Sequence, residues 1–513
     1  MRIDTWGIIM KNKNIFINIA IILGFMLIVS ANVFIQPLSN LDEIWIYNFG
    51  RCIINGLVPY RDFSIIITPL FAYIGAAYLK VFGDEMIVLR FAEVMQTAFI
   101  LFMTYKILEE LKLNKGIALL SSLGIYFLNS SVFCFDYNWA VLLVSLIIIY
   151  FELNEDNTLK YSLKKDLTLG ILAGTSILLK QTSGIVLSII VIGYKLVEIR
   201  SKKDFKEFLK IAITRLLGVL ISVLLFAIYL TINGIWSEFI DYTILGIKTF
   251  SNYVPYTRLF ETDYILAYTM PILLGLIILI SIATCIEKKL KSKQWTNKLH
   301  ILVIFDIATA VVVYPIADRG HFAIATVCTL ITTIFLVHVW IVYGLKIESK
   351  KIQYAFNTFF TAIATLVFAA QIGFSTYSII KCAGSLKEQN YFKHFTYIET
   401  PESLYQSLGK VGEYALEKEQ EGKTAIILDS MAAAINIPID KYYKNYDMFN
   451  LGNFGAKGED GIIEDLKYNK NTLLLIKKEN YKTNWQHPSK IISFVRENFN
   501  KIDEIEVFDV YSK

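Results

Sequence analysis

The chain has 513 residues, of which 55% are hydrophobic and 19% are charged, and its mean hydropathy is +0.49. This composition excludes a soluble globular protein and predicts a polytopic α-helical membrane protein. The formal net charge of +5 does not indicate nucleic-acid binding, because the basic residues form short clusters between apolar stretches. Five cysteines without a CxxC pair argue against a metal centre or a disulfide framework.

The first apolar run, Ile15–Ile35, follows Arg2, Lys11 and Lys13 and therefore resembles a signal peptide at first sight. The run is longer than the apolar core of a signal peptide, and no small-x-small cleavage motif follows it. We interpret it as an uncleaved signal anchor with a cytoplasmic N-terminus.

The apolar pattern predicts about 11 transmembrane helices, since one crossing needs about 20 apolar residues. The predicted crossings lie at about residues 14–36, 86–106, 116–132, 139–153, 167–180, 182–199, 211–233, 263–286, 299–315, 322–345 and 353–380.

One further apolar stretch, 64–82, contains Pro69 and Lys80, and the distribution of basic residues decides its placement. If it does not cross, the loops on the N-terminal side of the membrane hold 23 Lys and Arg residues, whereas the opposite loops hold 7. The loops on the N-terminal side are then 1–13, 106–115, 154–166, 195–210, 287–298 and 346–352. If it crossed, every later basic loop would face outward, against the positive-inside rule. The stretch therefore lies at the outer interface or dips in and returns, which makes the first outer loop long, about 37–85.

Two adjacent acids, Asp42 and Glu43, stand at the start of this first outer loop, ahead of the amphipathic stretch 44–55. Acids beside a hydrocarbon core must be hydrated or paired. A carboxylate at the membrane surface can act as general base on an acceptor hydroxyl. The alternative interpretation is a helix N-terminus, with Asn40 as its cap and both acids in the first turn.

Other ionisable residues fall at three further outer turns: Asp136, Lys180, and the segment Asp318-Arg319-Gly320-His321. Arg319 and His321 can bind phosphate oxygens, and Lys180 can contact a phosphate or pyrophosphate. The alternatives are a capped loop acid for Asp136, an end-of-span lysine that reaches the interface for Lys180, and an ordinary tight turn for 318–321.

Ionisable residues within the predicted spans are few. Arg90 and Glu93 are three residues apart, so we expect them to pair within one helix. Asp306 lies inside a predicted span and has no partner by spacing.

In the last 130 residues or so the apolar runs shorten to the length of β-strands. This predicts a small α/β domain over 382–513 after a transmembrane domain over 1–381. Strand-length apolar runs at Thr424–Leu428, Thr472–Ile476 and Ile505–Val510 alternate with helical patterns near 401–420, 459–468 and 488–499. An odd number of crossings places this domain outside the cell. The glycine-rich segment 452–458 lacks the Gly-Lys-Ser/Thr of a phosphate loop and is interpreted as a surface loop.

Four motifs, in this order, resemble the GT-C superfamily of membrane glycosyltransferases, near the family 39 branch of protein O-mannosyltransferases and aminoarabinose transferases. They are Leu41-Asp42-Glu43; Gly56-Leu57-Val58-Pro59-Tyr60-Arg61-Asp62 with Thr68-Pro69-Leu70-Phe71-Ala72-Tyr73 and Phe82-Gly83 ahead of Arg90; the run from Gly174 to Lys180-Gln181; and Pro315 with Asp318-Arg319-Gly320-His321. The resemblance covers roughly residues 10–350.

The resemblance implies a glycosyltransferase that uses a polyprenyl-phosphate-linked sugar at the outer face of the membrane. It implies that Asp42 is the catalytic acid of the first loop, that Glu43 is its companion, and that Asp136 is the acid of the second loop. Arg319 and His321 match the motif that holds the lipid phosphate, and we add Arg61 and Lys180 as candidate phosphate-binding residues. Transfer of a hexosyl or pentosyl group with inversion needs one base, which we assign to Asp42.

The acceptor is a glycan, a lipid or a protein, and the sequence does not choose between them. It establishes no cofactor and leaves open a divalent cation. A transporter or lipid flippase is one alternative function, but no internal repeat is evident and the ionisable residues gather at one face of the membrane. A polysaccharide polymerase or ligase is another, and a receptor that uses the outer domain is a third.

The predicted topology has 11 crossings, a cytoplasmic N-terminus and an outer C-terminus. A single cysteine introduced at Lys513 in a cysteine-free background should react with a membrane-impermeant maleimide in intact cells. Cysteines introduced within 288–293 should react only after permeabilisation. Labelling of the tail only after permeabilisation would reverse the assignment.

Overall fold

The computed structural model describes residues 5–38, 41–154, 159–199, 201–249, 255–262, 293–339, 341, 350–386, 392–400, 402–468, 471–479 and 484–513, with isolated positions between 265 and 279. The predicted span 263–286, the basic loop 287–292 and the cap residue Asn40 lie outside these residues, apart from those isolated positions.

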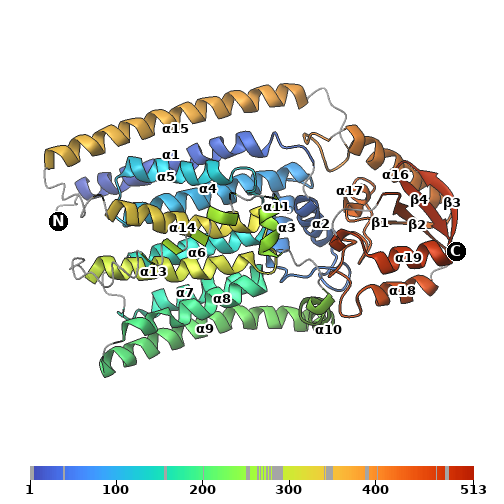
Figure 1. Cartoon of the computed structure of the whole chain (residues 1–513), viewed down its shortest axis with the longest axis horizontal. Coiled ribbons are helices and arrows are strands. Elements are labelled where there is room, and N and C mark those ends of the chain that lie inside the picture. The colour runs from blue at the N-terminus through green and yellow to red at the C-terminus, as the bar shows by residue number, and fades with distance from the viewer. Residues whose placement is uncertain are drawn as a thin grey trace.

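A bundle of long apolar helices forms the N-terminal three quarters of the molecule (Figure 1). These helices are α1 (Thr5–Val33), α4 (Met86–Glu110), α5 (Lys115–Asn129), α6 (Tyr137–Leu153), α7 (Leu163–Leu179), α8 (Gln181–Gly193), α9 (Lys202–Asn233), α13 (Lys293–Ala310), α14 (Arg319–Val339) and α15 (Lys350–Leu386). The predicted class of polytopic helical membrane protein is therefore confirmed.

Length and composition make six helices among the described residues candidates to cross a membrane. They are Ile15–Val33, Met86–Glu110, Gln181–Glu198, Lys202–Asn233, Arg319–Val339 and Lys351–Ala383. The number of crossings stays a prediction.

Two short helices, α2 (Leu41–Ile54) and α3 (Leu70–Phe82), pack together at one end of the bundle (Figure 1). Helix α3 covers most of the ambiguous stretch 64–82. Its 13 residues span about 20 Å at 1.5 Å per residue, which is less than the hydrocarbon thickness of about 30 Å. Helix α6, which we expect to cross, is also short, so length alone does not decide the question and the placement of this stretch stays a prediction.

A buried ion cluster joins helices α6, α7 and α9 at the opposite end of the bundle. Arg215 places Nη2 2.5 Å from Glu152 Oε1 and donates from Nε to Asp166 Oδ1 at 2.9 Å, while Lys195 Nζ lies 3.4 Å from Glu152 Oε2. Close helix packing accompanies these pairs, since a Cβ on Gly170 would lie 2.2 Å from the Arg215 carbonyl oxygen. Because each buried charge has a partner, the cluster fixes the bundle without an uncompensated charge.

The C-terminal part carries a four-stranded sheet in the order β1-β2-β4-β3. The strands of the sheet are β1 (Thr424–Leu428), β2 (Thr472–Lys477), β3 (Asn500–Ile505) and β4 (Phe508–Ser512). The helices of the C-terminal part include α16 (Glu402–Gln420), α17 (Ala432–Asn436), α18 (Gly458–Tyr468) and α19 (Ser489–Asn498). Strands β1 and β2 are parallel, and the other two pairings are antiparallel.

The prediction of one strand over 505–510 is wrong, because the chain reverses within it. Glu506 and Val507 form a two-residue turn in which Glu506 has a φ of 49°, and β3 and β4 pair on either side. The apolar pattern did not reveal this turn because no glycine, asparagine or aspartate marks its centre.

The glycine-rich loop 452–458 packs against the membrane part and is mostly buried, so its interpretation as a surface loop is wrong. Gly455 has a φ of 69°, and a Cβ there would lie 2.2 Å from Asp241 Oδ2. The same carboxylate accepts a hydrogen bond from the backbone N–H of Ala456 at 3.2 Å. Glycine is therefore required at position 455 for both conformation and close approach.

Helix α2 is the main contact between the bundle and the C-terminal part. Positions 45, 48 and 51 lie toward one side of the helix, and Asn55 directly follows its last residue. Trp45 donates to the Ser430 carbonyl at 3.3 Å, and Asn48 donates to Asp447 Oδ2 at 3.0 Å. Arg51 donates to Asp440 Oδ1 at 2.5 Å, and Asn55 donates to the Tyr442 hydroxyl at 2.7 Å.

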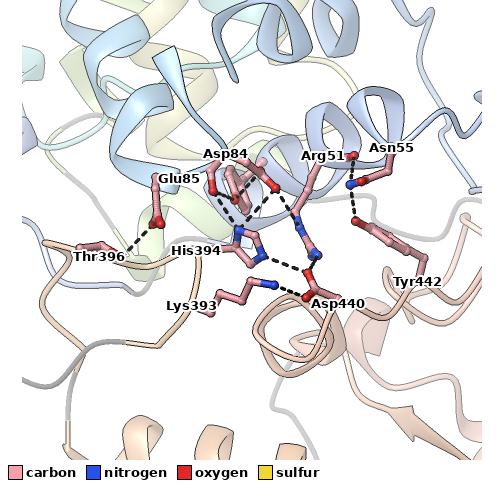
Figure 2. A network of polar contacts seen from close by, with 10 residues as sticks. Arg51, Asn55, Asp84, Glu85, Lys393, His394, Thr396, Asp440 and Tyr442 are labelled. Carbon is pink, nitrogen blue, oxygen red and sulfur yellow. Dashed lines mark hydrogen bonds and ion pairs between the residues drawn. The ribbon is translucent and has the colours of Figure 1, made fainter. Parts of the chain in front are cut away.

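Figure 2 shows the network around this contact. Asp440 Oδ1 lies 3.0 Å from Nε2 of His394, whose Nδ1 is 2.8 Å from the Asp84 carbonyl oxygen; Lys393 also pairs with Asp440. Burial alone would raise the pKa of Asp440, but hydrogen bonds from Lys393 and His394, with the charge of Arg51, hold it at about 2. The network ties the first loop to the C-terminal part and so fixes the orientation of α2.

Candidate active site

The two acids of the first loop occupy the first turn of α2 and have different surroundings. The Glu43 carboxylate accepts from Arg90 Nε at 2.6 Å and Nη2 at 3.2 Å. Arg90 is 2% exposed and also donates to the carbonyl oxygens of Gln36 and Pro37. The expected pair within one helix, Arg90 with Glu93, is therefore wrong as the main contact, because α2 brings Glu43 to the guanidinium. Asp42 is surrounded by protein at this end of the bundle but keeps part of its surface open to solvent.

Asp136 stands directly before α6 and is its N-cap. It is 4% exposed, and its Oδ1 accepts the backbone N–H of Asn138 at 2.5 Å. Gln96 of α4 supports the loop by donating to the carbonyl oxygens of Asp136 at 3.3 Å and Cys134 at 3.5 Å. The capped-acid interpretation is thus correct for the local geometry, and it leaves the charge of Asp136 available to neighbouring groups.

Lys180 separates α7 from α8. Its Nζ donates to Asn138 Oδ1 at 2.5 Å and lies 5.4 Å from the centre of the Tyr137 ring. The next residue, Gln181, fastens the first loop here, because its side chain accepts from the Thr68 N–H at 3.2 Å and donates to the Ile66 carbonyl at 2.9 Å. The lysine is therefore held toward the start of α6.

The turn 318–321 begins α14. Asp318 Oδ1 accepts the backbone N–H of His321 at 2.9 Å and lies 2.8 Å from its ring Nδ1. Asp318 thereby caps the helix and orients the imidazole. Burial alone would raise the pKa of Asp318, but the hydrogen bonds from His321 hold it below its usual value. Arg319, the first helical residue, is exposed.

These segments, far apart in the sequence, converge on Asp42. The charged groups that influence its pKa are Asp136, His321, Asp318 and Lys180. Helices α2, α6, α8 and α14 all start at these residues, so four helix N-termini share one end of the bundle. Unsatisfied N–H groups and the helix dipole favour anions at such ends.

Desolvation by the surrounding protein, reinforced by repulsion from Asp136, raises the pKa of Asp42 to about 6. Burial also raises the pKa of Asp136, although Lys180 opposes this effect. Burial lowers the pKa of Lys180, against the attraction of Asp136 and Asp42. An accessible carboxylate with a pKa near neutrality is suited to accept a proton from a substrate.

Not every predicted site residue joins this cluster. Arg61 is 49% exposed and pairs with Asp62, with Nη2 to Oδ2 at 3.0 Å. Glu238 also influences its charge, and Lys444 donates to its carbonyl oxygen at 2.9 Å. Asp306 accepts from Thr329 Oγ1 at 2.6 Å, which supplies the partner that sequence spacing did not reveal. Within the described ranges, no three His, Cys, Asp or Glu side chains gather as a metal-binding group.

Sequence reasoning missed two members of the site. Asn138 accepts from Lys180, and its position two residues after Asp136 was the available signal. Asp318 was recognised as part of its motif but not as a site residue; a carboxylate three residues before a histidine at a helix start was the signal. Arg90 was misassigned, since its contact with Glu43 depends on a separation of 47 residues.

No family model matches the sequence, and no curated protein does so either. Solved structures do match the fold. ArnT, the aminoarabinose transferase from Cupriavidus metallidurans, has a TM-score of 0.53 in its apo state at 11% identity, over 98% of each chain. The same protein bound to undecaprenyl phosphate has a TM-score of 0.52 at 11% identity, over 97% of each chain.

The fold is therefore shared with a solved membrane protein of the kind that the sequence motifs resemble. More particularly, the whole chain, including its C-terminal part, follows the fold of ArnT.

The two adjacent acids should respond differently to removal of their charge. Glu43→Gln leaves the buried Arg90 guanidinium without its anion, so we expect a loss of about 2–3 kcal/mol and a lower Tm in detergent. Asp42→Asn removes a carboxylate whose charged form is disfavoured by desolvation and by Asp136, so the Tm should stay the same or rise. A fall in Tm for Asp42→Asn as large as that for Glu43→Gln would contradict this division of roles.

Proposed function

We propose that this protein transfers a sugar from a polyprenyl-phosphate-linked donor to an acceptor hydroxyl at the membrane surface. The observation that carries the proposal is the convergence of Asp42, Asp136, Lys180 and the turn 318–321 at one end of a helical bundle. A transporter would favour polar sites near the middle of its spans, whereas these groups lie at the ends of their helices.

Three features support a phosphate donor. Four helix N-termini supply a favourable electrostatic environment for an anion. Lys180, Arg319 and His321 supply cationic or hydrogen-bonding side chains at the same end. In addition, ArnT, which shares the fold, has been solved with undecaprenyl phosphate bound.

Asp42 is the proposed base. In this mechanism the acceptor oxygen attacks the anomeric carbon while the bond from that carbon to the phosphate oxygen breaks. The acceptor proton passes to the Asp42 carboxylate, and the lipid phosphate leaves with the bonding electron pair. A single displacement inverts the anomeric configuration, and the cations offset the charge that grows on the phosphate.

The other two acids support this step from different positions. Glu43 anchors the first turn of α2 on Arg90 and thereby positions Asp42. Asp136 raises the affinity of Asp42 for a proton. Lys180, Arg319 and His321 contact the donor phosphate, and Arg61 contributes only if the donor or acceptor extends beyond the cluster toward Asp62.

The transferred group is a hexosyl or pentosyl residue, and the acceptor is a glycan, lipid or protein. The site and the domain formed by residues 382–513 face the outside of the cell, with residues 1–381 as the catalytic membrane domain. The domain contacts α2 directly, so it borders the region where an acceptor must enter.

The first test removes the base. Asp42→Asn should lower transfer from a polyprenyl-phosphate-linked sugar by about 100-fold or more, within the usual contribution of a general base, while the protein stays folded. Wild-type transfer should also fall about tenfold per pH unit below about 6, because protonation of Asp42, whose pKa is about 6, removes the base. Near-normal transfer by a folded Asp42→Asn protein would exclude this role.

The second test addresses the donor. Arg319→Ala should weaken binding of a polyprenyl-phosphate-linked sugar by about 10- to 150-fold, the value of a charge-assisted hydrogen bond of about 1.5–3 kcal/mol. Arg319→Lys should recover only part of the affinity, because an ammonium cannot make a two-pronged contact. Arg258→Ala, in another outer loop, serves as the control.

Two results of this binding experiment separate the site from the class of function. Unchanged affinity in Arg319→Ala would remove Arg319 from the donor site and leave the enzyme class standing. Absence of donor binding by the wild-type protein, together with solute movement across sealed vesicles, would instead favour a transporter.

A further inference from the structure

A cavity of about 760 Å³ opens at the end of the bundle opposite Asp42. It lies between the α4–α5 turn, the end of α14 and the start of α15. Helix α14 runs from Arg319 near the candidate site to Val339 beside the cavity. Its 21 residues cover about 30 Å, so the cavity and the active site belong to opposite faces of the membrane.

Close contact between two helices sets one limit of the cavity. Gly116 of α5 lies against α15, where a Cβ would be 2.6 Å from Thr361 Cα. The Thr361 hydroxyl also donates to Asn114 Oδ1 at 3.2 Å. The α15 side chains that line the cavity, Ile352 to Asn357, precede this contact, so the space begins where the two helices cease to touch.

The lining has a polar part and an apolar part. Lys112 and Lys115 stand at the α4–α5 turn, with exposed side-chain fractions of 63% and 58%. Most of the apolar part comes from α14 and α15, with Ile334, Val337, Ile352 and Phe356, and Leu113, Ile117 and Ile341 complete it. A molecule that fills this space needs an anionic head and an apolar tail.

The charge of the turn supports an anionic head. Four lysines (Lys106, Lys112, Lys115 and Lys298) pair with two glutamates (Glu109 and Glu110), which leaves a surplus of two positive charges. Lys112 and Lys115 lie 3.7 and 3.3 Å from their glutamate partners at exposed positions, so these pairs can exchange for a phosphate at low cost.

We propose that this cavity is a binding site for an anionic phospholipid. The phosphate contacts Lys112 and Lys115, and an acyl chain lies between α14 and α15 along Val337 and Phe356. Basic pockets between transmembrane helices on the cytoplasmic side recognise lipid headgroups in this way, and the charge distribution predicts that this end faces the cytoplasm. The site is independent of the proposed sugar transfer.

The proposal can be tested with the whole protein in nanodiscs that contain equal amounts of phosphatidylglycerol and phosphatidylcholine. Lipids retained by the protein after release are counted by native mass spectrometry. The wild-type protein should retain phosphatidylglycerol in preference to phosphatidylcholine. The double variant Lys112→Gln/Lys115→Gln should bind phosphatidylglycerol about 10- to 30-fold more weakly, as expected for the loss of two lysines near an anionic lipid.

Two further variants make the result specific. Lys202→Gln/Lys203→Gln removes the same charge from exposed positions at the start of α9, on the same side of the bundle, and should retain phosphatidylglycerol as the wild type does. Val337→Trp fills the apolar part and should reduce retention of both lipids. Equal loss in the two double variants, or equal retention of both lipids by the wild type, would overturn the proposal. Displacement of the lipid by polyprenyl phosphate alone would also overturn it and assign the cavity to the donor.

Discussion

The ion pair between Glu43 and Arg90 holds the rest of the site in place. Arg90 lies near the start of a long apolar helix, where an unpaired guanidinium would be costly, and its carboxylate partner is supplied by α2. Since Glu43 and Asp42 are neighbours in one helical turn, the pair that satisfies Arg90 also sets the position of Asp42. A buried charge in the membrane domain thus determines where the candidate base stands.

Helix α2 is fixed from two directions. Its first turn is attached to α4 through Arg90, and the face that carries Asn48 and Arg51 is attached to the C-terminal part. Burial raises the pKa of Asp447, the partner of Asn48, to about 6 even though two asparagine side chains donate to it. The contact is therefore sensitive to geometry, because a small shift of α2 would leave buried polar groups without partners.

Much of the fold could be predicted because the pattern of apolar residues indicates most of the helices and strands. The long helices, the strands at 424 and 472, and the short helix α3 all follow from the length of apolar runs and the placement of charge. The hairpin at Glu506 could not be predicted, because a glutamate in the left-handed region leaves no compositional mark. Its conformation is imposed by the pairing of β3 with β4.

Several residues of the candidate site could be predicted because their polar side chains lie at the ends of helices. Asp136 and Lys180 directly precede a helix and His321 lies in the first turn of one, and the alternation of helix direction brings those ends together. Arg61 is also a cation that could bind a phosphate. Its guanidinium instead pairs with the adjacent Asp62, and this local pair sets the orientation of its side chain. The pairing of Arg90 with Glu43 could not be predicted from the sequence, because the spacing along the chain favours Glu93. The packing of α2 against α4 brings Glu43 to the guanidinium instead.

The hairpin of β3 and β4 also protects the sheet at its edge. Strand β3 is one of the two edge strands, and its residues are largely exposed, among them Lys501, Asp503 and Glu504. Its register is irregular between 501 and 503. Charges and a register break on an outer strand disfavour the addition of a strand from a second molecule. A densely populated membrane can therefore hold many copies of this chain without sheet-to-sheet aggregation through that edge.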